Sequence, residues 1–193
     1  PSELIVGPPA ATDRAPSAAD SPTTTSPVVP TAGPPFPVRL EKNVRIPMRD
    51  GVTLAADIWR PDTDGQFPAL LQVSYYVTGP GLAEPFAPRG YVCILANSRG
   101  RGGSEGDWDP YVNEPRDVFD AQEWVAQQPW CNGRVGMFGQ SYNAFTQTMS
   151  APLANSHFVC MVPAEGQQSF FGHQYNDGVL QLNVVFTHGL FAT

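Results

Sequence analysis

The hexapeptide Gly139-Gln140-Ser141-Tyr142-Asn143-Ala144 places a serine hydroxyl where it could attack a carbonyl carbon. An apolar run, Val135–Phe138, precedes it, and a predicted helix from Tyr142 to about Ser150 follows it. A serine on a sharp strand-to-helix turn is pushed clear of the sheet, and the helix N-terminus behind it supplies N–H groups near a developing oxyanion. The setting therefore predicts that Ser141 is a nucleophile.

The same residues have a simpler interpretation, in which Ser141 caps the helix with its hydroxyl. A Gly-x-Ser tripeptide alone favours the cap, because such tripeptides are common. The strand before the turn and the helix after it favour the nucleophile. Gly139 also fits a tight turn, since a side chain two residues before the serine would collide with it.

A glycine-rich loop, Arg99–Gly106, follows a second apolar run. Glu105 occupies the place where a dinucleotide-binding G-x-G-x-x-G would need its last glycine, and the Arg-Gly-Gly unit does not repeat as in RNA-binding tracts. We predict a structural loop in which Arg99 and Asp107 serve as turn and ion-pair residues.

The elements around these motifs are those of a sheet with intervening helices. Val44–Ile46 and Val52–Trp59 flank Asp50-Gly51, a dipeptide that favours a type I′ hairpin turn. The continuous apolar runs Ala69–Val73 and Tyr91–Ala96 are typical of strands buried on both faces.

Asn113-Glu114-Pro115 opens a predicted helix that continues through Gln127, with Val118, Ala121 and Val125 on one side. A further apolar run, Phe158–Pro163, comes after the Ser141 helix. Strand and helix alternate as in an α/β protein with a parallel sheet.

Four sequence blocks make the prediction specific. They are "VRIPMRDGVTLAADIWRP", "NSRGRGGSEGDW", "EPRDVFDAQEWVAQQPWCNGRVGMFG" and "GQSYNA". The stretch Val44–Ala151 resembles the start of the catalytic domain in the X-Pro dipeptidyl-peptidase family, which includes cocaine esterase and the α-amino-acid ester hydrolases. The resemblance implies an α/β-hydrolase fold, here its N-terminal portion, truncated before the last strands. The family's pattern is G-x-S-Y-x-G, so Ala144 replaces its final glycine.

The resemblance also implies an oxyanion hole. Similar proteins form it from the backbone N–H after the nucleophile, here that of Tyr142, and from a tyrosine phenol after the strand "PALLQVSYY". Tyr76 takes that position by counting from Pro68. Tyr75 is the alternative, because neighbouring strand residues point to opposite faces and only one of the two can reach the site.

A base and an acid are still needed to activate the serine. The histidines that follow Ser141 are His157, His173 and His188. An Asp177–His188 relay has the right order but leaves no room for the strands that should carry it. Only 52 residues follow Ser141, so we expect the acid and base in downstream sequence and no triad-dependent activity from the 193-residue chain alone.

Composition sets the first 37 residues apart, because they hold 10 of the 21 prolines and Phe36 as their only aromatic residue. Such a segment buries too little surface to fold. We predict a disordered Pro/Ala/Thr/Ser-rich leader over residues 1–37, a catalytic-domain portion over 38–164 and the start of a cap or lid over 165–193. The leader is compatible with an exported or a cytoplasmic protein and favours export.

Charge and cysteine content exclude several partners. A net charge of −7 argues against nucleic acid, and no apolar run is long enough to span a membrane. Cys93, Cys131 and Cys160 show neither a disulfide framework nor a metal pattern, and we predict buried free thiols and no cofactor or metal.

Two functions from different classes follow from the sequence. The first is a serine hydrolase of small-molecule esters, amides or X-Pro peptides. The second is a noncatalytic truncated chain that acts only by binding. A longer reading frame with a later Asp and His would support the first.

Overall fold

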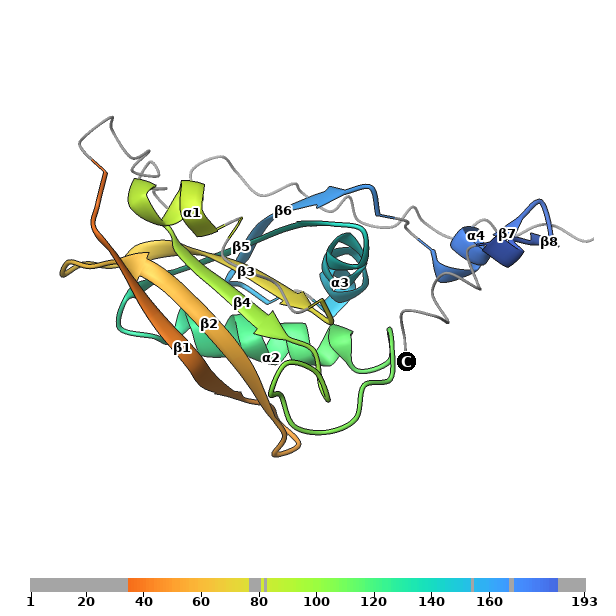
Figure 1. The fold of residues 1–193 in the computed structure, drawn as a ribbon, viewed down its shortest axis with the longest axis horizontal. Coiled ribbons are helices and arrows are strands. Elements are labelled where there is room, and N and C mark those ends of the chain that lie inside the picture. Colours follow the sequence, from red (N-terminus) through yellow and green to blue (C-terminus); the bar gives the residue numbers. More distant parts are fainter. Residues whose placement is uncertain (1–34, 77–80, 82, 154, 167–168, 184–193) are drawn as a thin grey trace, which may run out of the picture. The chain divides into compact units, whose positions relative to one another are not determined.

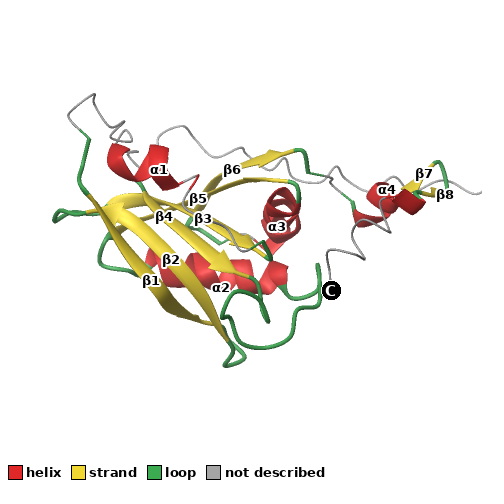
Figure 2. Ribbon diagram, viewed as in Figure 1, coloured by secondary structure: helices red, strands yellow, loops and turns green. Residues whose placement is uncertain are grey.

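The computed structural model describes residues 35–76, 81, 83–153, 155–166 and 169–183. Its main feature is a six-stranded sheet with the order β1-β2-β4-β3-β5-β6 (Figure 1). Helices and strands alternate from β3 to β6 (Figure 2). The predicted α/β class is therefore correct.

The elements occur in the predicted order. The strands of the sheet are β1 Val38–Pro47, β2 Thr53–Pro61, β3 Phe67–Ser74, β4 Val92–Asn97, β5 Cys131–Gln140 and β6 Phe158–Ala164. The helices that connect them are α1 Ala83–Phe86, the 3₁₀ helix η3 Ala87–Arg89, α2 Glu114–Ala126, α3 Tyr142–Ser150 and the 3₁₀ helix η4 Ala151–Leu153. A separate small group contains α4 Phe170–Gln174, β7 Tyr175–Asn176 and β8 Val179–Leu180.

The sheet has an antiparallel half and a parallel half. β1 pairs with β2 and β2 with β4 in antiparallel fashion. β4, β3, β5 and β6 run parallel to one another. The carboxyl ends of these parallel strands share one edge, where open α/β sheets place their ligands. Ser141 follows β5 at that edge.

Both faces of the sheet are covered. In β4, Ile94 joins a core with Leu71, Met137 and the α2 residue Val118. Its neighbour Cys93 belongs to a smaller cluster on the opposite face, with Trp59, Ala83, Ala87 and Leu95. Successive strand residues point to opposite faces, so α2 covers one side and α1 with η3 the other (Figure 1). This two-sided burial explains the continuous apolar runs in the sequence.

β5 is longer than the apolar run that predicted it. It begins at Cys131, which pairs with Phe67 across an irregularity in the register. Gly133 lies inside this strand with φ 79°. Helix α2 has already ended at Ala126.

The turn of the β1–β2 hairpin differs from the predicted type I′ turn. Met48 donates its N–H to the carbonyl of Val52 at 2.8 Å, which closes a three-residue loop. Gly51 has φ 88°, but Asp50 is not in the left-handed region. A type I′ turn needs positive φ at both central residues. The type I′ prediction is wrong because the loop between Met48 and Val52 has three residues rather than two, and such a loop needs positive φ only at its last residue, Gly51. The Asp50 carboxylate binds Arg99 at 2.7 Å.

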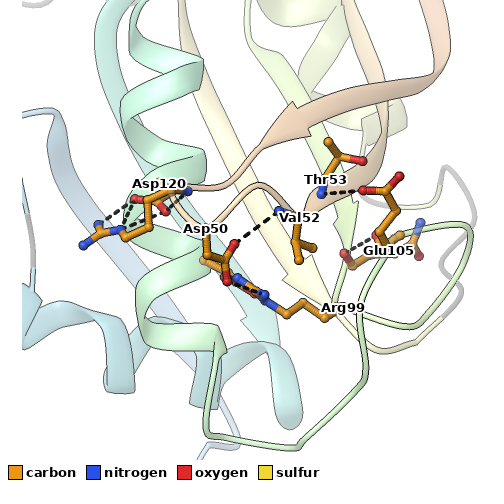
Figure 3. Close-up of polar contacts among 10 residues, drawn as sticks. Asp50, Val52, Thr53, Arg99, Glu105 and Asp120 are labelled. Atoms are coloured by element: carbon orange, nitrogen blue, oxygen red, sulfur yellow. Dashed lines mark hydrogen bonds and ion pairs between the residues drawn. The ribbon is translucent and has the colours of Figure 1, made fainter.

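Two arginines connect the hairpin tip to helix α2 (Figure 3). Arg49 binds Asp120 on α2 at 2.6 Å. Arg99 lies between Asp50, on the tip, and Asp117 on α2, which it contacts at 2.6 Å. The glycine-rich loop joins the same cluster, since Glu105 accepts a hydrogen bond from the Thr53 N–H at 3.0 Å. The loop thus has structural contacts, with Arg99 as an ion-pair residue as predicted.

Asp107 has no comparable contact. The ion pairs of the described residues do not include it, so the loop is held by Arg99 and Glu105 rather than by Asp107. The predicted ion-pair role for Asp107 is therefore wrong. Glu105 is closer to the hairpin because the loop turns back on itself, with the Gly100 N–H donating to the Glu105 carbonyl at 3.0 Å.

The Arg99–Asp117 pair is almost fully buried, with side-chain exposures of 11% and 3%. Burial raises the pKa of Asp117, an effect that Arg99 opposes. We expect Asp117→Asn to lower the free energy of unfolding by about 2–3 kcal/mol, because it leaves a buried guanidinium with one partner fewer. Asp120→Asn is the matched control on the same helix, and its effect should be several-fold smaller because Arg49 is mostly exposed. Urea unfolding of both variants measures the difference, and equal losses would contradict this account.

The cysteines follow the prediction in part. Cys93 and Cys131 are buried free thiols, and burial raises the pKa of Cys93 to about 12. Cys160 is also free but exposed, so the prediction that it is buried is wrong. The reason is that β6 lies at the edge of the sheet and most of its residues are exposed.

The predicted leader lies mostly outside the described residues. Its last residues, however, contact the sheet region. Phe36 donates its N–H to the carbonyl of Pro88 at 2.8 Å and packs edge-on against Phe67, while Pro37 accepts a hydrogen bond from the Asp62 N–H. Phe36 and Pro37, which the prediction placed in the leader, therefore contact residues of the sheet region.

Candidate active site

Ser141 occupies the junction between β5 and α3 with φ 58° and ψ −121°. Residues other than glycine rarely adopt positive φ, and such strain is found at functional sites. Hydrogen bonds hold the turn, since the Ser141 N–H donates to the Ala164 carbonyl at 3.0 Å and the Ser141 carbonyl accepts from Ala144 at 2.9 Å. The side chain makes no capping hydrogen bond. The geometry therefore does not support the simple N-cap interpretation.

Gly139 permits the close approach on which this turn depends. A Cβ atom at this position would lie 2.5 Å from Cβ of Asn143 and 2.7 Å from Nε2 of Gln72. No real Cβ could occupy that space without a backbone shift, and the φ of 145° is also unfavourable for other residues. Gly139 is required here for the reason expected from the sequence.

Ala144 replaces the final glycine of the family pattern, and the structure shows what accommodates its methyl group. Ala144 is fully buried, and the residue that faces it is Gly166, after β6. A Cβ on Gly166 would lie 2.2 Å from Cβ of Ala144. The methyl group of Ala144 fits on α3 because the facing residue, Gly166, has no side chain.

Tyr76 reaches the serine and Tyr75 does not. The Tyr76 hydroxyl lies 3.3 Å from Oγ of Ser141. Tyr75 stacks on Trp108 with ring centroids 4.8 Å apart and packs edge-on against Tyr142. Burial raises the pKa of Tyr75 well above its ordinary value. The two rings lie only 4.2 Å apart in a bend after β3, so the expected strand alternation does not separate them. Of the two, Tyr76 has its hydroxyl beside Oγ of Ser141.

The backbone N–H of Tyr142 is the first of α3. The first N–H groups of a helix have no acceptor within the helix. Together with the Tyr76 hydroxyl, two donors of the kind an oxyanion hole needs adjoin one exposed serine.

Residues 50–191 of this chain match the model of the X-Pro dipeptidyl-peptidase (S15) family.

The chain belongs to the X-Pro dipeptidyl-peptidase (S15) family.

Sequence relatives and solved structures agree with the family assignment. Cocaine esterase from Rhodococcus sp. (strain MB1 Bresler) is 41% identical over 56% of this chain and 20% of its own length. A putative serine esterase from Mycobacterium bovis is 28% identical over 58% of this chain and 22% of its own length. The crystal structure of a CocE/NonD family hydrolase from Staphylococcus aureus superposes with a TM-score of 0.70 and 28% identity, covering 79% of this chain and 32% of that one. The sheet has the α/β-hydrolase fold, as predicted.

This member of the S15 family spans about a fifth of the length of the two esterases it matches. The matched residues 50–191 include β3, Tyr76 just after it and the Ser141 turn.

No histidine of the described side chains lies beside Ser141. His157 precedes β6, and its Nδ1 lies 3.1 Å from the Gly133 carbonyl near the start of β5. At about 3.3 Å per residue, the strand from Gly133 to Ser141 is roughly 25 Å long. His157 therefore lies at the start of β5, whereas Ser141 follows its end, and His157 cannot serve as the base.

The described residues do not test the predicted Asp177–His188 relay. Asp177 is exposed and lies in the turn between β7 and β8 with φ 50°. His188 lies outside the described residues, as does the side chain of His173. The predicted cap region is described only for α4 and the β7–β8 hairpin.

Two acidic residues near the Ser141 turn were not singled out as site residues from the sequence. Glu165, directly after β6, accepts a hydrogen bond from the side chain of Gln140. Glu114 accepts one from the hydroxyl of Tyr142. Glu165 lies in no motif, and Glu114 opens one of the four sequence blocks without any sign of a place in the site. The pairing of β5 with β6 and the packing of α2 on α3 bring them there. Within the described residues, no three potential ligands gather into a metal site, and no helix is long and apolar enough to cross a membrane.

Proposed function

We propose that this chain carries the nucleophile of a serine hydrolase that cleaves an acyl ester, an amide or an X-Pro peptide bond through an acyl-enzyme on Ser141. The observation that carries the proposal is the 3.3 Å approach of the Tyr76 hydroxyl to Oγ of Ser141, at a turn with φ 58°. The names of the relatives, an esterase and a putative serine esterase, support it.

The proposed reaction has two steps. Oγ of Ser141 attacks the substrate carbonyl carbon while a base takes the hydroxyl proton, and the carbonyl oxygen becomes an oxyanion that accepts hydrogen bonds from Tyr76 and the Tyr142 N–H. Collapse breaks the bond to the alcohol or amine, which leaves with that proton. Water then attacks the acyl-enzyme, the acid leaves and Ser141 regains its proton. We expect the base and its orienting acid downstream of Ser141 in the sequence, because the order in this fold is Ser, then Asp or Glu, then His.

A fluorophosphonate probe tests this function in the full-length protein. We expect one probe mass on the peptide that contains Ser141, because an activated serine in an oxyanion hole attacks the phosphorus. The 193-residue chain alone should stay unlabelled for lack of a base. Failure to label the full-length protein would favour the noncatalytic binding chain. Labelling of the 193-residue chain that is lost in His188→Ala would instead support the Asp177–His188 relay.

A further inference from the structure

Glu114 has a carboxyl group that is almost fully buried. It is the first residue of α2 and only 3% exposed. Burial raises the pKa of the Glu114 carboxyl, although the hydrogen bond from Tyr142 lowers it. A buried carboxyl lowers the stability of the fold unless its contacts offset the desolvation. The contacts that Glu114 makes therefore call for an explanation.

One oxygen of Glu114 accepts a hydrogen bond from the hydroxyl of Tyr142. Burial and the nearby Glu114 carboxylate raise the pKa of that hydroxyl, so it stays protonated and donates. The indole of Trp108 lies close enough for its N–H to lower the pKa of Glu114, yet not in hydrogen-bond geometry. The Tyr142 hydroxyl is thus the principal partner of this acid.

Tyr142 is also the residue next to Ser141, and its ring contacts both tyrosines at the end of β3. The ring packs edge-on against Tyr75 at 4.6 Å and against Tyr76 at 6.4 Å. On its other side it contacts Tyr111 at 4.9 Å. The Tyr142 side chain therefore contacts Tyr76, whose hydroxyl approaches Ser141. Tyr142 itself supplies the first N–H of α3.

From these contacts we propose that Glu114 is a positioning residue for the oxyanion hole. By holding the Tyr142 hydroxyl, it fixes the Tyr142 ring, and that ring sets the separation between the Tyr142 N–H and the Tyr76 hydroxyl. The inference rests on the proposed function of Ser141. Oxyanion donors act through fixed geometry, so freeing the ring lowers kcat while substrate binding is retained.

The experiment uses the full-length protein, p-nitrophenyl acetate as substrate and a fluorophosphonate to count active sites. Glu114→Leu removes the acceptor and Tyr142→Phe removes the donor. We expect each to lower kcat per titrated site by about 10-fold, with KM within about twofold, as for a small misplacement of a catalytic group. The double variant should be no worse than Tyr142→Phe alone, because both single variants remove the Glu114–Tyr142 hydrogen bond and Tyr142→Phe also removes the acceptor of the Tyr111 N–H. Glu114→Gln keeps an acceptor and should recover most of kcat.

Gln122→Leu is the matched control. Gln122 is a buried polar residue on the same helix, and its side chain contacts Sδ of Met137 rather than the Ser141 turn. Its replacement should lower stability but leave kcat per titrated site unchanged. If Glu114→Leu fails to fold, Tyr142→Phe and Glu114→Gln carry the comparison.

Two results would overturn the inference: unchanged kcat per site in Tyr142→Phe, or losses that add in the double variant. Failure of the proposed function looks different. In that case the unmodified protein takes up no fluorophosphonate at Ser141, whereas a wrong role for Glu114 leaves the labelling intact.

Discussion

Replacing Ser141 with alanine in the full-length protein is expected to lower kcat by at least about 10⁴-fold, to the residual rate that binding and an oxyanion hole alone provide. Without Oγ no acyl-enzyme forms. The backbone at φ 58° is no worse for alanine than for serine, so folding should be unaffected. Steady-state hydrolysis of p-nitrophenyl acetate and a thermal unfolding curve measure the two effects.

Ser150→Ala is the control for Ser141→Ala. Ser150 lies at the far end of α3, and its hydroxyl donates to the Gln147 carbonyl at 3.0 Å. Its loss should leave kcat unchanged. Turnover in Ser141→Ala equal to that of the unmodified protein would reject Ser141 as the nucleophile, whatever its geometry.

Tyr76→Phe is expected to lower kcat by about 10²-fold to 10³-fold, the cost of one oxyanion donor. The phenol is 37% exposed and lies 3.3 Å from Oγ of Ser141, so its removal should disturb little packing. KM should change much less than kcat, since the donor acts on charge that develops in the transition state. Initial rates over a range of ester concentrations separate the two constants.

Tyr75→Phe provides the paired comparison one residue away. Tyr75 packs against Trp108 and Tyr142, and phenylalanine keeps these ring contacts. Its kcat should stay within about threefold of the unmodified protein, as expected for a hydroxyl that makes no contact with charge in the transition state. A larger loss from Tyr75→Phe than from Tyr76→Phe would mean that the other ring supplies the donor.

Local patterns were sufficient for most of the fold. The apolar runs before and after each helix marked β3, β4 and β5, because buried parallel strands need apolar side chains on both faces. The turn at Asp50 could not be predicted in the same way. A two-residue type I′ loop is one local preference of Asp-Gly, and a three-residue loop with glycine in the left-handed region is another. The sequence does not show which residues pair across the turn, and the structure pairs Met48 with Val52.

The candidate site was likewise predictable only in part. The Ser141 turn could be found because its glycine, serine and flanking elements are contiguous. Glu114 could not, since its partner Tyr142 is 28 residues away and helix α2 gives no sign of which residue will face it. The accommodation of Ala144 by Gly166 also depends on two segments meeting in space. Pairs of this kind leave no pattern in a single sequence.

The backbone angle of Ser141 has an evolutionary consequence. At φ 58° and ψ −121° glycine is the residue with the lowest conformational energy, so the serine is kept at this position at the expense of stability. Under the proposed function, a descendant that no longer needs this nucleophile would gain stability by the single replacement Ser141→Gly. Among homologues, glycine at this position would therefore mark lineages in which selection for chemistry has ended while the fold is still in use.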